Sequence, residues 1–208
     1  MAEFWEKSFQ SNQEMWGWEP ADSVAETVEL FKGHGLTKIL IPGFGYGRNA
    51  KMFHDNGFTV TGIEISETAI DLAKRQFGES LKIHHGSVSS MPFDNKLYDG
   101  IFCYSLIHLL GPAERSKLIA DCYNQLETNG YMVFVSISKN DFRYLEGEKV
   151  SEDTVKKSYG VTLYFYGPES IQSDFGKYGL VEAREVTESK ENQGNKPIQR
   201  FWYIVCKK

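Results

Sequence analysis

The chain has 208 residues, enough for one domain with a full hydrophobic core, and 41% of them are hydrophobic. A formal net charge of −5 argues against a nucleic-acid partner, because binding a phosphate backbone depends on clustered lysine and arginine. No basic leader and no run of apolar residues long enough to span a bilayer is present, so we expect a cytoplasmic protein without a membrane partner.

The first twenty residues are unusually rich in aromatic side chains, which stand among charged and polar residues. Trp5 and Phe9 are four positions apart, as they would be in a helix packed on the core. Aromatic faces also attract cations, so residues 1–20, with Trp16 and Trp18, can equally be an aromatic lid over a cationic ligand. Further along, Ser23-Val-Ala-Glu26 predicts a capping box for a helix that ends at Gly33.

Three glycines follow the first predicted strand at alternate positions. The apolar run 39–41 is typical of a buried parallel strand, and Gly43, Gly45 and Gly47 separate it from a helical pattern that begins at Arg48. Glycine adopts backbone angles that other residues avoid and lets a ligand lie against the main chain. Free N–H groups at the start of the helix would face the same ligand.

The second predicted strand, 58–63, ends in Glu64, about twenty positions after the glycine turn. An acidic residue at that place fits the two hydroxyl groups of a ribose. A dinucleotide turn reads G-x-G-x-x-G, but the third glycine here stands at 47 and Arg48 occupies the position that the dinucleotide pattern needs. The spacing therefore disfavours a dinucleotide, and we expect another ribose-containing ligand at this turn.

The segment Pro42-Gly-Phe-Gly-Tyr-Gly-Arg-Asn49 resembles the glycine motif of the class I S-adenosylmethionine (SAM)-dependent methyltransferases. It looks most like their small-molecule branch, near the thiopurine and tellurite-resistance methyltransferases. Most members carry an acidic residue where this chain has Pro42, which weakens one expected contact to the amino end of the cofactor. The resemblance covers nearly the whole chain in element order, and it favours the lid interpretation for Trp16-Gly-Trp18-Glu-Pro20.

Two later stretches are expected to complete the cofactor site. After a helix capped by Ser66 and a third strand at 81–84, the loop 86–94 places Ser87 where the family commonly has an acid that holds the adenine amino group. The N–H of Val88 would be the second adenine contact, although an ordinary serine-capped loop is the alternative. The fourth strand, 98–105, ends at the same edge of the sheet.

The end of that fourth strand should bring Cys103, Tyr104, Ser105 and His108 close to the transferred methyl group. A structural polar contact explains His108 at least as well, and a packed aromatic explains Tyr104 almost as well. The cysteines Cys103, Cys122 and Cys206 are an odd count in strand-like or helical runs, and we interpret them as reduced core residues.

The rest of the chain completes an α/β fold. A helix from Pro112, a strand at 131–137 and a helix from Pro168 are followed by strands at 180–186 and 200–206, which pair antiparallel because no helix separates them. Between them, the charged connector 188–197 is expected to be mobile. The irregular segment 139–166 covers the substrate in the resembling family, and a surface excursion packed by its own aromatics is the alternative.

The resulting prediction is one domain, 1–208, with a Rossmann-like, doubly wound, mostly parallel seven-stranded sheet, an antiparallel C-terminal edge hairpin and helices on both faces. The resemblance implies SAM as cofactor and S-adenosyl-L-homocysteine (SAH) as product. Expected cofactor contacts are Trp18, Gly43, Phe44, Gly45, Gly47, Arg48, Asn49, Glu64, Ile65, Ser87, Val88, Cys103 and Tyr104, and weaker substrate-pocket candidates are Trp16, Ser105 and His108.

Methyl transfer from a sulfonium is an in-line displacement, so the protein must align the acceptor and exclude water but need not supply a nucleophile. The sequence accordingly shows no Ser/His/Asp set, no Cys/His spacing for a metal and no phosphate loop, and no catalytic residue is identified. A small thiol, amine or oxyanion is the expected acceptor. An NAD-dependent oxidoreductase and a non-catalytic SAM-binding module remain the alternatives.

Overall fold

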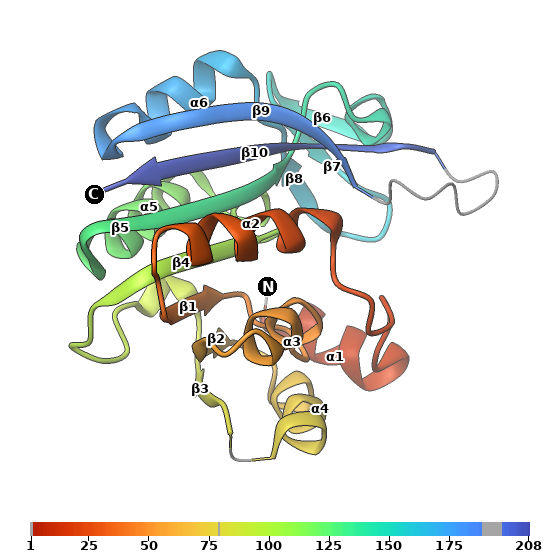
Figure 1. The fold of residues 1–208 in the computed structure, drawn as a ribbon. Helices are drawn as coiled ribbons and strands as arrows, with labels where there is room; N and C mark the ends of the chain where they lie inside the picture. The colour runs from red at the N-terminus through yellow and green to blue at the C-terminus, as the bar shows by residue number, and fades with distance from the viewer. Residues whose placement is uncertain (1, 79, 189–196) are drawn as a thin grey trace.

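A computed structural model of the chain describes residues 2–78, 80–188 and 197–208. Seven strands form one sheet in the order β3-β2-β1-β4-β5-β10-β9, as Figure 1 shows. The neighbouring strands from β3 to β5 pair in parallel, and β10 pairs antiparallel with both β5 and β9. The predicted Rossmann-like fold with its reversed C-terminal hairpin is confirmed. The strands are β1 (Lys38–Pro42), β2 (Thr59–Glu64), β3 (Lys82–His85), β4 (Tyr98–Tyr104), β5 (Leu126–Ile137), β9 (Leu180–Glu188) and β10 (Gln199–Lys207).

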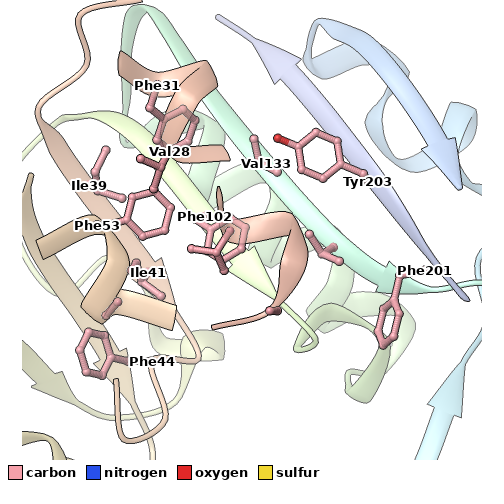
Figure 2. Packing of buried hydrophobic residues seen from close by; sticks show 14 of the residues in the cluster. Val28, Phe31, Ile39, Ile41, Phe44, Phe53, Phe102, Val133, Phe201 and Tyr203 are labelled. Carbon is pink, nitrogen blue, oxygen red and sulfur yellow. The ribbon is translucent and has the colours of Figure 1, made fainter. Parts of the chain in front are cut away.

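Helices cover both faces of the sheet because its central strands are apolar on both sides. Helices α2 (Asp22–Gly33) and α3 (Arg48–Asp55) bury Phe31 and Phe53 against Phe102 of β4, a packing that Figure 2 shows from close by. Helices α5 (Pro112–Asn124) and α6 (Pro168–Phe175) pack on the opposite face, where alternate residues such as Cys103 point.

Helix α1 (Ala2–Asn12) and the segment 139–166 lie at the edge where the parallel strands end (Figure 1). Helix α1 lies against α4 (Glu67–Phe77), and the Glu6 carboxylate accepts hydrogen bonds from Ser66 Oγ and Thr68 at the start of α4. The expectation of a packed terminal helix is thus met for the first part of 1–20.

The segment 139–166 holds a second, three-stranded antiparallel sheet that the sequence did not predict. It consists of β6 (Glu148–Ser151), β7 (Thr154–Lys156) and β8 (Thr162–Tyr164) and follows a short 3₁₀ helix, η3 (Phe142–Leu145). Each strand has only three or four residues, so none shows enough apolar alternation to be recognised.

The predicted capping box at Ser23 is wrong. Helix α2 begins at Asp22, and the buried Ser23 hydroxyl has no hydrogen-bond partner within the part of the chain that the structure describes. The Glu188 carboxylate instead accepts the N–H groups of Asp22, at 2.9 Å, and Ser23, at 3.4 Å. The sequence placed Glu188 in a mobile connector, but it is the buried last residue of β9; the connector residues 189–196 lie outside the described residues.

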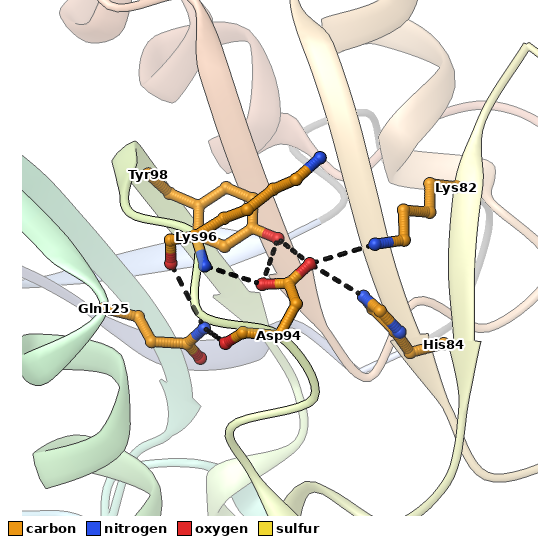
Figure 3. Close-up of polar contacts among 6 residues, drawn as sticks. All are labelled: Lys82, His84, Asp94, Lys96, Tyr98 and Gln125. Carbon is orange, nitrogen blue, oxygen red and sulfur yellow. Dashed lines mark hydrogen bonds and ion pairs between the residues drawn. The ribbon is translucent and has the colours of Figure 1, made fainter.

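A polar cluster around Asp94 ties the loop before β4 to the start of β3. Asp94 Oδ2 accepts from Lys82 Nζ at 3.0 Å and lies 3.1 Å from His84 Nε2, while Tyr98 Oη donates to the same carboxylate (Figure 3). Gln125 Nε2 donates to the Asp94 carbonyl at 3.2 Å. These contacts give the Asp94 carboxylate a structural role that needs no ligand.

None of the described helices is long and apolar enough to cross a membrane. The three cysteines are buried and form no disulfide, which agrees with their interpretation as core residues.

Candidate cofactor site

The glycine turn joins β1 to α3 and is held against the end of β2. The N–H groups of Gly43 and Phe44 both donate to the carbonyl of Ile63, each at 3.0 Å. Gly45 and Gly47 have φ angles of +60° and +89°, in the left-handed region that favours glycine. The predicted strand–turn–helix arrangement is therefore present, and the N-cap position of α3, Gly47, carries no side-chain cap.

The three glycines serve different purposes. A Cβ atom added at Gly43 would lie 3.0 Å from a Leu106 methyl carbon, and one added at Gly47 would lie 2.6 Å from the Phe77 ring, so both positions are packed by protein. A Cβ added at Gly45 would meet no described atom within 4 Å. Of the three, only Gly45 therefore leaves open space beside the main chain for a ligand.

Glu64 lies directly beside this open position. Its Oε2 accepts the Gly45 N–H at 2.7 Å, and its Oε1 accepts the N–H groups of Ile65 and Ser66 at 2.8 and 2.9 Å. Burial raises the pKa of this carboxyl, while the three hydrogen bonds oppose the rise. Each carboxylate oxygen has two acceptor sites, so Glu64 Oε2 can accept a further hydrogen bond besides that from Gly45.

Residues 16–21, which we call the strap, run along the other side of the turn. The Tyr46 hydroxyl donates to the Gly17 carbonyl at 2.6 Å and accepts the Trp16 N–H at 3.2 Å. Arg48 Nη1 donates to the Glu19 carbonyl at 2.9 Å, and Asn49 Oδ1 accepts the Ala21 N–H at 3.0 Å. The structure thus brings Trp16, Trp18, Arg48 and Asn49 together.

The strap tryptophans contact the turn through Tyr46. The Trp18 ring meets the Tyr46 ring edge-on at 5.2 Å between centroids, and Trp16 stacks on it at 6.2 Å with an interplanar angle of 11°. Trp16 is 51% exposed, whereas Tyr46 is buried. Tyr46 was missed in the sequence, although a bulky aromatic residue between two turn glycines was a signal that could have identified it.

The end of β4 brings Tyr104 close to Arg48. The Tyr104 ring stacks between Phe102, at 6.2 Å, and Phe201, at 6.0 Å, and the Arg48 guanidinium lies 5.9 Å from its centre. Burial raises the pKa of Tyr104 far above its usual value, so this hydroxyl stays protonated. The Tyr104 ring is therefore a packed aromatic. Its position at the end of β4 is the one that the pocket interpretation expects.

Cys103 and Ser105, on either side of Tyr104, differ in what they can offer a ligand. The Cys103 side chain is fully buried in the core on the α5 side, which leaves only its main chain for contact with a ligand. Ser105 has a φ angle of +54°, unusual for a residue with a side chain, and such backbone strain is frequent at functional sites.

His108 is held as a neutral structural residue. Its Nδ1 accepts the Ile137 N–H at 3.3 Å and lies 3.3 Å from Ser136 Oγ, and the residue is 5% exposed. Burial, with a smaller contribution from Arg143, lowers the pKa of His108 to about 3. Because the basic nitrogen is already engaged and protonates so reluctantly, these contacts support the structural alternative for His108 over a role as general base.

The loop after β3 forms a short 3₁₀ helix, η1 (Val88–Ser90), which Ser87 caps by accepting the Ser89 N–H at 3.2 Å. The serine-capped alternative therefore describes this loop, and the Ser87 hydroxyl keeps its hydrogen for another partner. Within the described residues, no group of three His, Cys, Asp or Glu side chains could hold a metal ion.

Comparison with known proteins finds similarity to methyltransferases. A model of the methyltransferase domain family matches residues 40–134. The sarcosine/dimethylglycine N-methyltransferase of Aphanothece halophytica is 30% identical over 111 residues, which are 50% of this chain and 39% of that protein. Thiocyanate methyltransferase 1 of Brassica oleracea is 25% identical over 135 residues, which are 62% and 59% of the two chains.

A third relative, the tRNA N(3)-cytidine methyltransferase METTL2 of Danio rerio, is 24% identical over 203 residues, 89% of this chain and 57% of that protein. The matches thus cover between 39% and 59% of the lengths of these curated relatives.

Solved structures share the fold at low sequence identity. A Burkholderia thailandensis 1,6-didemethyltoxoflavin-N1-methyltransferase, with 1,6-didemethyltoxoflavin and SAH bound, superposes with a TM-score of 0.72 at 15% identity and covers 100% of this chain and 88% of its own. TehB from Haemophilus influenzae gives a TM-score of 0.68 at 15% identity and covers 98% and 67% of the two chains.

The strand order and the glycine turn, together with these matches, define a protein with the class I methyltransferase fold. Within that fold, the stretch that the methyltransferase domain model matches, residues 40–134, runs from β1 into β5.

Proposed function

We propose that the chain transfers a methyl group from SAM to a small-molecule acceptor, and that it belongs to the small-molecule branch of the class I enzymes. The observation that carries this proposal is the pairing of the open Gly45 position with the Glu64 carboxylate at 2.7 Å. A bare main chain beside a buried acid is the arrangement that a ribose-containing ligand needs.

The residues present fit SAM. Glu64 would accept a hydrogen bond from a ribose hydroxyl through the remaining acceptor site of Oε2, and the main chain at Gly45 and the start of α3 would face the amino-acid part. Trp18, held edge-on against Tyr46, would offer an aromatic face to the sulfonium charge. Bound SAM supplies an activated methyl group that is open to in-line displacement.

Further contacts in the proposed site come from the main chain at Gly43, Phe44 and Gly47, from Arg48 and Asn49, and from Ile65, Ser87, Val88, Cys103 and Tyr104. The acceptor would lie near Trp16, Ser105 and the ring edge of His108, under a cover formed by 139–166. Burial keeps the Tyr104 hydroxyl protonated and makes neutral His108 a poor proton acceptor, so neither supports a role as general base. An acceptor that is nucleophilic without such a base, a thiol, amine or oxyanion, suits this site best.

Ligand-dependent thermal unfolding tests the cofactor. SAM or SAH at a hundred times its dissociation constant should stabilise the chain by about 2.7 kcal/mol, and NAD at the same concentration should not. Stabilisation by NAD alone would contradict the proposal and favour the oxidoreductase.

Turnover tests the reaction itself. SAH release should be measured with small thiols, amines and oxyanions and, in a separate arm, with tRNA. Release with a small acceptor supports the proposal, whereas release with tRNA alone would contradict the small-molecule acceptor that the net charge of −5 favours. SAH binding without release in any arm would favour the non-catalytic binding module.

A further inference from the structure

Tyr46 connects the two sides of the glycine turn. It lies between Gly45 and Gly47, the residue is only 1% exposed, and its hydroxyl holds both the Trp16 N–H and the Gly17 carbonyl of the strap. Its ring is also the common contact of Trp16 and Trp18.

The conformation of the turn determines both sides at once. The φ angles of +60° at Gly45 and +89° at Gly47 fix the direction in which the intervening Tyr46 side chain leaves the main chain. The conformation that leaves Gly45 open is therefore the same one that brings the Tyr46 hydroxyl within hydrogen-bond distance of the strap.

Arg48 and Asn49, which follow in the same motif, also hold the strap through their side chains. Arg48 donates to the Glu19 carbonyl and Asn49 accepts the Ala21 N–H, so three side chains within four positions hold the strap from Trp16 to Ala21. A strap held in this way keeps Trp18 next to the turn, where it meets Tyr46 and Phe77.

We infer that Tyr46 is a positioning residue that couples SAM binding at the turn to docking of the strap. The inference rests on the proposed function, because it requires SAM or SAH at Gly45. A ligand that stabilises this turn conformation also stabilises the docked strap, and by linkage a docked strap raises the affinity for the ligand. If only the docked form binds well, the apparent dissociation constant rises as the docked fraction falls.

Replacing Tyr46 by phenylalanine tests the coupling, because it keeps the ring contacts and removes only the hydroxyl. Tyr203→Phe is the matched control, since Tyr203 is also 1% exposed and its hydroxyl lies 3.1 Å from Thr27 Oγ1, away from the turn. Calorimetry should show SAH affinity reduced by about five- to tenfold in Tyr46→Phe, because the variant loses both hydrogen bonds between the hydroxyl and the strap. The Tyr203→Phe affinity should stay within about twofold of wild type on the same scale.

Limited proteolysis gives a readout that a merely structural role would not change. SAH should protect the strap from cleavage in the wild-type chain and in Tyr203→Phe, and protect it much less in Tyr46→Phe. Unchanged SAH affinity or full strap protection in Tyr46→Phe would overturn the inference while leaving the proposed function intact. Failure of the wild-type chain to bind SAM or SAH would overturn both.

If Tyr46→Phe fails to fold, hydrogen exchange on the wild-type chain tests the coupling between SAH binding and docking of the strap. Because the Trp16 N–H donates to the Tyr46 hydroxyl, SAH should slow its exchange with solvent. An exchange rate that SAH does not change would overturn the coupling.

Discussion

The Gly45 N–H and the Glu64 carboxylate, 19 positions apart in the chain, meet at 2.7 Å. The hydrogen bond links the turn after β1 to the last residue of β2, so the acid that would face the ribose also fixes the loop that would face the rest of the cofactor. The local fold depends on this carboxylate and the proposed ligand binding would depend on it too, so variants of Glu64 should affect both.

Glu64→Gln should lower the stability of the chain and its affinity for SAH. The amide keeps one acceptor oxygen but turns an NH₂ group toward one of the three N–H donors, which loses its partner. We expect a loss of about 1–3 kcal/mol in the free energy of unfolding, measured with urea, and weaker SAH binding by calorimetry. Wild-type values in both measurements would show that the carboxylate is not required at the turn.

Gly45→Val should prevent SAM binding while the sheet stays folded. The added side chain points into open space, so the expected cost in stability is the strain of a positive φ angle, about 1–2 kcal/mol. Gly35→Val is the matched control, because Gly35 has a φ angle of +68°, an equally open Cβ position and a place after α2. Similar melting temperatures with SAH binding lost only in Gly45→Val are expected; normal binding by Gly45→Val would mean that no ligand lies against this turn.

His108 should make the chain less stable in mild acid. Its pKa in the folded chain is about 3, below the ordinary 6.5, so the unfolded chain binds the proton more readily. The contribution of neutral His108 to stability is present above pH 6.5 and is lost as the pH falls from 6.5 toward 3. Urea unfolding across this range should show a smaller acid-induced loss for His108→Asn than for wild type, and identical slopes would contradict the prediction.

Glu6→Gln should loosen α1 from α4. Hydrogen bonds from Thr68 and Ser66 lower the pKa of Glu6 to about 2, so its carboxylate stabilises the docked helix above pH 4.5, and this contribution is lost as the pH falls from 4.5 toward 2. Protease cleavage within α1 should increase in the variant at neutral pH. Glu3→Gln is the control, since Glu3 contacts only Lys7 of its own helix among the described residues. Equal cleavage of the two variants would contradict the docking role.

Local signals predicted most of the fold. The glycine turn, the Ser66 cap and the proline starts of α5 and α6 each depend on neighbours within a few positions, and all are found where the sequence placed them. The order of strands then follows from how parallel strands and crossover helices connect.

Contacts between distant positions could not be predicted in the same way. The cap of α2 comes from Glu188, 166 positions after Asp22, so the nearby Ser23 was a misleading signal. The bonds between Tyr46 and the strap span 29 and 30 positions and depend on how α1 lies on α4, which no local pattern encodes. The open space at Gly45, rather than the glycine spacing, is what separates this position from the packed glycines on either side.

The place of β10 in the sheet has a consequence for synthesis of the chain. Strand β10 lies between β5 and β9, yet it follows both of them in the sequence. While the ribosome is still adding residues up to Lys207, β5 presents an unpaired strand edge and β9 has no neighbour in the sheet. Unpaired edges promote association between chains, so the nascent protein is prone to aggregate until β10 emerges and pairs with both strands.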